Sequence, residues 1–226
     1  MMTKLMLDQE LFDFLNDLQA NNNREWFAAN KKQFQLQEQK AKSFFESIYS
    51  KLEQVDSIEK MQIFRIYRDV RFSKDKSPYK NHFSVGFSRT KPLLRGGMYL
   101  HIENNASFVG GGFWAPNADD LFRIRKEIEL DASELNAIIS ADTFVTYFSC
   151  LKGEELKTAP KGFDKTHEAI ALIRKKQFLL TRNFTNKEVL SPNFSEEVIQ
   201  TFCAMRPFFD YMSDVLTTDL NGESLY

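Results

Sequence analysis

Hydrophobic residues near the N-terminus recur every three or four positions, the spacing of one helix face. The pattern predicts a helix over residues 8–20, with Asp8 as its N-cap and an apolar face of Leu11, Phe12, Leu15 and Leu18. A second, longer helix is expected to begin at Asn22, where Glu25 can complete the cap, and to run to Leu52. Two helices therefore precede the rest of the fold.

The middle of the chain changes to alternating apolar and polar residues, the period of a half-buried strand. This alternation predicts four strands, at residues 62–72, 82–88, 98–103 and 107–113. The last two are separated by Asn104-Asn105, a hairpin-type turn. Four short strands in succession indicate an antiparallel sheet.

Helical spacing returns in the second half of the chain. Helices are expected after Asn117, over 133–141, over 167–175 and from Ser195 to Val215, the last with a kink or restart at Pro207. Strands are expected at 144–152 and 177–184. We therefore predict a single α+β domain over residues 1–226, with its core at about 7–215 and a frayed tail at 217–226. Its sheet, mostly antiparallel and of about five or six strands, is packed by helices from the N- and C-terminal parts of the chain.

Composition adds limits on the kind of protein. The chain has 226 residues, 42% hydrophobic and 22 of them Phe, enough for a large apolar core. Cys150 and Cys203, the two cysteines, match no metal-type spacing and suit a reducing compartment better than a disulfide framework. We find no signal peptide and no membrane-spanning run, and we predict a cytoplasmic protein without a membrane partner.

Positive charge is concentrated in Arg65–Lys80, the basic segment, which has six basic residues in a chain of net charge -1. Guanidinium and ammonium groups bind carboxylates and phosphates. We predict a strand-plus-loop clamp for an anionic small molecule or nucleotide; the near-neutral net charge does not support general nucleic-acid binding. The predicted contacts are Arg65, Arg68 and Arg71 as fixed cations, Lys74, Lys76 and Lys80 as mobile ones, Asp69 as an orienting acceptor, and Tyr79 for stacking or hydrogen bonding.

The same segment has a structural interpretation. Asp69 lies between Arg68 and Arg71, and Asp75 lies between two lysines. These acids can neutralise their neighbours in an internal salt-bridge network. Ligand binding and a structural network both stay open.

Four motifs carry a family resemblance. They are Asn22-Asn-Arg-Glu-Trp-Phe27, the basic segment Arg65–Lys80, Phe108-Val-Gly-Gly-Gly112 and Pro160-Lys-Gly-Phe163. From about Leu7 to about Val215, the chain resembles the family known as domain of unknown function 2461. The resemblance implies a single-domain, widespread microbial protein, and it supplies no activity and no catalytic residues.

Candidate chemistry lies in Tyr99-Leu-His-Ile-Glu103, where alternation puts His101 and Glu103 on one sheet face. A His and a carboxylate side by side form a plausible acid–base pair, and these two are our predicted catalytic residues. His82 lies on the expected neighbouring strand and can join them. Two histidines and a glutamate can also bind a metal, but the spacing matches no defined motif. We favour a hydrogen-bonded polar sheet face and predict no metal site.

Three classes of function therefore remain. The first is a domain that binds a phosphate- or carboxylate-bearing ligand through residues 65–80. The second is a hydrolase- or nuclease-like enzyme that uses His101 and Glu103. The third is a structural or protein-interaction domain in which residues 65–80 form an internal salt-bridge network. The sequence specifies no cofactor and no oligomeric state.

Overall fold

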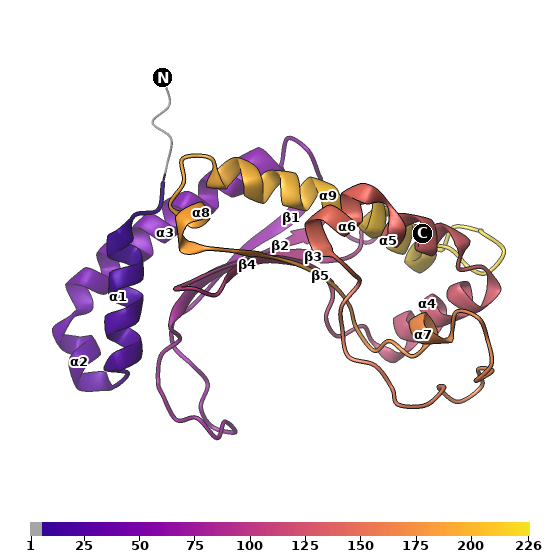
Figure 1. Cartoon of the computed structure of the whole chain (residues 1–226), viewed down its shortest axis with the longest axis horizontal. Helices are drawn as coiled ribbons and strands as arrows, with labels where there is room; N and C mark the ends of the chain where they lie inside the picture. The colour runs from indigo at the N-terminus through magenta and orange to yellow at the C-terminus, as the bar shows by residue number, and fades with distance from the viewer. Residues whose placement is uncertain (1–5) are drawn as a thin grey trace.

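A five-stranded antiparallel sheet forms the centre of the protein (Figure 1). The structure, a computed structural model, describes residues 6–226. The strands lie in chain order, each antiparallel to the next: β1 (Ile58–Phe64), β2 (His82–Arg89), β3 (Gly97–Glu103), β4 (Ser107–Phe113) and β5 (Phe178–Phe184). This architecture confirms the predicted α+β class with a mostly antiparallel sheet.

The described chain has nine helices. They are α1 (Gln9–Ala20), α2 (Arg24–Ala29), α3 (Lys31–Leu52), α4 (Ala118–Leu130), α5 (Ser133–Ser140), α6 (Asp142–Phe148), α7 (Ile170–Ile173), α8 (Asn186–Val189) and α9 (Phe194–Thr217). Helices α3 and α9, from opposite ends of the chain, cover one face of the sheet (Figure 1). The other face has no helix of the described chain across its centre. It is flanked by α1 and α2 on one side and by α4 and α7 on the other.

Alternation along the strands explains this asymmetry. In β2 the side chains of Phe83, Val85 and Phe87 are buried against the helices, whereas His82 and Gly86 face the other way. Burying each large apolar side chain contributes about 1.5–3 kcal/mol, so the helix-covered face supplies much of the folding free energy. The open face of the sheet is consequently not required for packing against the helices.

Polar caps fix where several helices begin. Asp8 accepts a hydrogen bond from the Leu11 amide at 3.3 Å, as predicted, and Asn117 caps α4 in the same way at 2.8 Å. The expected long helix from Asn22 is instead two helices, because the chain turns at Asn30. Asn23 is the N-cap of α2, which leaves the Asn22 side chain for another contact.

Two strand predictions are wrong. The strand expected at 62–72 is β1, Ile58–Phe64, and the chain beyond Phe64 pairs with the rest of its loop only through a Tyr67–Tyr79 bridge. Apolar alternation misleads there, since Phe72 is 98% exposed. The strand expected at 144–152 is helix α6, in which Phe144 and Phe148 lie one turn apart on the buried side.

The C-terminal helix continues through Pro207 without a restart. Its last residue, Thr217, is buried, so the tail begins one residue later than predicted. The carbonyls of Thr218 and Asp219 accept hydrogen bonds from the Arg123 guanidinium, each at 3.0 Å. Fraying of the remaining tail stays a prediction.

Candidate functional site

The open face of the sheet contains a cleft made of two adjoining parts. One, the polar pocket, has a volume of about 700 Å³ and lies between the α1–α2 turn, the basic segment and the ends of β2 and β3. The other, the apolar groove, has a volume of about 560 Å³ and runs across β3, β4 and β5. His82 and His101 line both parts, so they mark the junction of the cleft.

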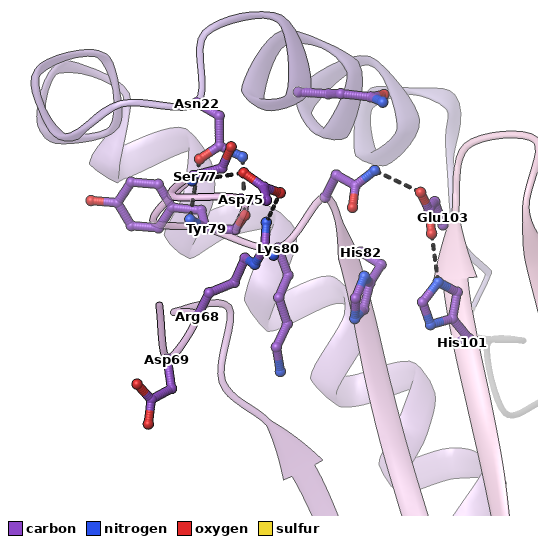
Figure 2. A pocket seen from close by; sticks show the side chains of 12 residues that line it. Asn22, Arg68, Asp69, Asp75, Ser77, Tyr79, Lys80, His82, His101 and Glu103 are labelled. Carbon is purple, nitrogen blue, oxygen red and sulfur yellow. Dashed lines mark hydrogen bonds and ion pairs between the residues drawn. The ribbon is translucent and has the colours of Figure 1, made fainter. Parts of the chain in front are cut away.

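Polar contacts link Asn81, Glu103 and His101 in a row (Figure 2). His101 Nε2 lies 2.7 Å from Glu103 Oε2, and the Asn81 amide donates to Glu103 Oε1 at 2.6 Å. The His82 ring lies against the His101 ring, with a centroid separation of 4.0 Å. The shared face predicted for His101 and Glu103 is thus present, and His82 joins them from β2.

Burial keeps both imidazoles uncharged. Desolvation lowers the pKa of His82 to about 3, with further lowering by His101, Lys80 and Arg68. Desolvation also lowers the pKa of His101, although the hydrogen bond to Glu103 opposes the shift. In a neutral His101 ring, one nitrogen faces Glu103 at 2.7 Å and the other faces the Tyr99 hydroxyl at 3.3 Å.

The basic segment is not a strand but a loop with a fixed base. The Lys80 amide donates to the Ile66 carbonyl at 2.7 Å, and the Arg68 amide donates to the Pro78 carbonyl at 2.9 Å. Asn22 binds the main chain of Tyr79 twice: its carbonyl oxygen accepts from the amide at 3.1 Å and its NH₂ donates to the carbonyl at 3.0 Å. The α1–α2 turn therefore holds this wall of the cleft.

Replacing Asn22 with alanine should loosen that wall. The change removes both contacts to Tyr79, and a buried or half-buried polar group left without its partner costs about 1–3 kcal/mol. We expect amide hydrogen exchange at Tyr79 and Lys80, followed by NMR, to accelerate at least about tenfold. Asn21→Ala is the matched control, because the Asn21 side chain binds only the Asp17 carbonyl of its own helix. Equal exchange rates in the two variants would contradict the assigned anchor.

The arginines of the basic segment are largely engaged with its own acids. Arg68 forms an ion pair with Asp75, and Arg71 NH2 lies 2.6 Å from Asp69 Oδ2. These pairs hold the pKa values of both carboxyl groups below their usual range. Both arginines are thus paired within their own segment, and that segment is not the strand that was expected. Contact of Arg68 or Arg71 with a ligand stays a prediction.

The other residues predicted to contact a ligand lie in different surroundings. Arg65 and Lys74 are exposed and form no ion pair in the part of the chain that the structure describes. The Lys76 ammonium donates to the Val70 carbonyl at 2.9 Å, within its own loop. Tyr79 is only 6% exposed and stacks on Phe27 with a centroid separation of 3.9 Å. Tyr79 therefore packs the loop against α2. It also lines the polar pocket, and its contact with a ligand stays a prediction.

Lys80 lines the polar pocket together with Arg68. Its ammonium lies 5.6 Å from the centroid of the Phe64 ring and has no carboxylate partner among residues 6–226. Partial burial and the nearby Arg65 lower its pKa. Figure 2 shows its side chain beside that of His82 in the polar pocket. The Phe64 ring that it approaches lines the apolar groove.

The apolar groove was not predicted from the sequence. Its walls include Phe64, Tyr99 and Phe108 from three strands, with Leu179 from β5 and the 71%-exposed Trp114. The Phe108 ring stacks on His101 at 4.8 Å, so the groove starts where the polar contacts end. The available signal was alternation in β4, which puts Phe108 and Gly110 on the same face as His101.

Fold and site together define a single-domain α+β protein with an amphipathic cleft on the open face of an antiparallel sheet. Residues 10–211 match the family model described as a conserved hypothetical protein (DUF2461). The chain belongs to this family, domain of unknown function 2461, as the motifs indicated. No curated protein and no solved structure matches the chain, so function is argued from the site alone.

The family motifs gather around the cleft. Asn22 and Phe27 both contact Tyr79, and Phe108 to Gly112 forms part of the groove. Phe163 of the fourth motif packs elsewhere, against Phe122. Within residues 6–226, no helix has the length and apolar character needed to cross a membrane.

Proposed function

We propose that the cleft binds a small organic anion with an apolar, aromatic body. The observation that carries this proposal is the position of Lys80. Its ammonium has no carboxylate partner in the described chain and lies where the polar pocket meets the apolar groove. A half-buried cation without a counter-ion favours a ligand that brings the negative charge.

The groove supports the second half of the proposal. Its lining is mainly aromatic and aliphatic, and Gly110 and Gly112 leave its floor without side chains. A planar apolar group can lie there against Tyr99, Phe108 and Trp114, since aromatic rings favour such stacking. Ligand sites commonly combine a mostly apolar lining with a few polar groups that orient the ligand. A carboxylate or phosphate joined to an aromatic body, as in a mononucleotide, has this chemistry.

The proposal can be tested with two dyes that differ by one charge. 8-Anilinonaphthalene-1-sulfonate has an aromatic body and an anion, whereas N-phenyl-1-naphthylamine has the same body without the anion. We expect Lys80→Met to weaken binding of the sulfonate at least about tenfold, because a charge-assisted contact contributes about 1.5–3 kcal/mol. Binding of the neutral dye should stay unchanged. Fluorescence titration measures both.

Matched variants locate the effect. Lys74→Met removes an exposed lysine of the same segment and should leave both affinities unchanged. Energy transfer from tryptophan to the bound dye should fall more in Trp114→Phe than in Trp26→Phe, since only Trp114 lines the groove. Equal weakening by Lys80→Met and Lys74→Met, or equal loss of both dyes, would refute the assigned anion contact.

Hydrolysis is a second candidate function, favoured by one contact. His101 Nε2 lies 2.7 Å from Glu103 Oε2 at the cleft, so the carboxylate fixes the orientation of the ring. An oriented imidazole can take a proton from an attacking water. This candidate differs from the first in requiring turnover of the bound anion and not only its retention.

A further inference from the structure

We propose that His82, His101 and Glu103 form a binding site for one divalent transition-metal ion of the zinc class. One nitrogen of each ring and one oxygen of the carboxylate all lie within 4.8 Å of one another. The strands create this grouping: His82 pairs directly with Glu103 across β2 and β3, and His101 lies two residues before Glu103 on the same face. The site itself is independent of the proposed ligand.

The donor set decides the class of metal. Two neutral imidazoles and one carboxylate match the three-ligand sets of catalytic zinc and of related transition metals. Calcium and magnesium prefer oxygen donors, of which this group has only one side chain. Ligand atoms around tetrahedral zinc lie roughly 3.3 Å apart, given bonds of about 2.0–2.2 Å. Metal binding therefore requires separations of up to 4.8 Å to shorten and the 2.7 Å contact between His101 Nε2 and Glu103 Oε2 to widen.

Neighbouring groups orient the ligands as a metal site requires. Asn81 holds the Glu103 carboxylate through Oε1, which leaves Oε2 directed at His101. The Tyr99 hydroxyl lies 3.3 Å from His101 Nδ1. When the ion replaces the hydrogen between His101 Nε2 and Glu103 Oε2, the ring proton resides on Nδ1. There the Tyr99 oxygen accepts it, which fixes the tautomer.

His82 distinguishes this site from an ordinary polar sheet face. Its ring is half-buried against the His101 ring, and neither nitrogen makes a hydrogen bond within residues 6–226. A metal ion can therefore bind one of these nitrogens without breaking an existing hydrogen bond.

The surroundings leave one side of the site open. Lys80 and Arg68 are the cations near His82, and both oppose a bound cation. An anionic group in the cleft offsets their repulsion and can fill the open metal position. This last contact, between the metal and the anion of a ligand, rests on the proposed function.

Zinc binding by tag-free, chelator-treated protein tests the site directly. We expect calorimetry to show one bound Zn²⁺ per chain. The chain has three histidines, so ¹⁵N-histidine NMR resolves the ligands. The His82 and His101 ring signals should shift on titration, and those of His167, which lies near Glu129 away from the cleft, should not. This measurement needs no variant and so does not depend on whether a variant folds.

Variants complete the test. His101→Ala and Glu103→Gln should each weaken Zn²⁺ binding more than about 100-fold, and Asn81→Ala about tenfold, as changes outside the ligand set do. His167→Gln is the control and should have no effect. No bound zinc at millimolar concentration, unshifted His82 and His101 signals, or equal loss in His167→Gln would overturn the site.

The metal site and the proposed anion-binding function can be refuted independently of each other. Lys80→Met removes no metal ligand, so zinc binding should survive in that variant. If zinc binds and the sulfonate dye does not, the metal site stands and the proposed ligand is wrong. If the dye binds through Lys80 and zinc does not, the metal site is wrong and the proposed ligand stands.

Discussion

Arg89→Met should lower the free energy of unfolding by about 3–5 kcal/mol. The Arg89 side chain is only 1% exposed, at the end of β2. Its Nε lies 2.9 Å from Asp56 Oδ2, and its NH2 donates to Asp210 Oδ1 at 2.6 Å. Asp56 is equally buried, so removing the guanidinium leaves a carboxylate without solvent or counter-ion. Urea unfolding measures the loss.

Two further variants isolate the buried charge as the cause. Arg71→Met breaks an exposed pair with Asp69 and should leave the unfolding midpoint unchanged. The double variant Arg89→Met/Asp56→Leu should recover part of the stability, because it removes the stranded charge as well. A double variant as unstable as the sum of its two single variants would show that the pair does not act as a unit.

This ion pair also shows what the sequence leaves hidden. Arg89 and Asp56 are separated by 33 positions, and Arg89 and Asp210 by 121, so their meeting depends on how α9 packs on the sheet. Nothing local marks Arg89 as buried, since most arginines are exposed. The strand predicted there accordingly ends at residue 88, one residue before Arg89.

The parts of the site that were predictable are those fixed by strand period. Alternation alone places His101 and Glu103 on one face, because neighbouring side chains in a strand point to opposite sides. Bringing in His82 required only that consecutive strands pair, which they usually do. The chemistry at the junction of the cleft therefore follows from local pattern.

The basic segment was harder for a physical reason. Its apolar residues alternate, but a strand forms only where a neighbour offers hydrogen bonds. Beyond Phe64 the segment leaves the sheet and is anchored by Asn22, 57 positions before Tyr79. Which cations face the cleft depends on that anchor, so Lys80 could not be separated from the arginines by sequence alone.

Gly112→Ala should lower the free energy of unfolding by about 3 kcal/mol or more. Gly112 has φ +127°, a conformation that side-chain-bearing residues rarely adopt and that alone costs about 1–3 kcal/mol. A methyl group there would also lie 2.1 Å from the Phe178 carbonyl oxygen, a main-chain atom. Relief requires β4 and β5 to separate where Gly112 pairs with Leu179. Urea unfolding measures the loss.

Gly86→Ala is the matched control on the same open face. Its added methyl group would meet the Phe64 ring at 3.4 Å, an ordinary contact with a side chain that can rotate. An alanine in a strand loses less entropy on folding than glycine, so we expect stability within about 1 kcal/mol of the original. Gly112 and Leu179 also line the apolar groove. In the folded protein without urea, Gly112→Ala should therefore also weaken binding of the neutral dye. If Gly112→Ala is as stable as Gly86→Ala and binds the neutral dye equally well, the prediction is wrong. The close pairing of β4 and β5 at Gly112 would then not determine the shape of the groove floor.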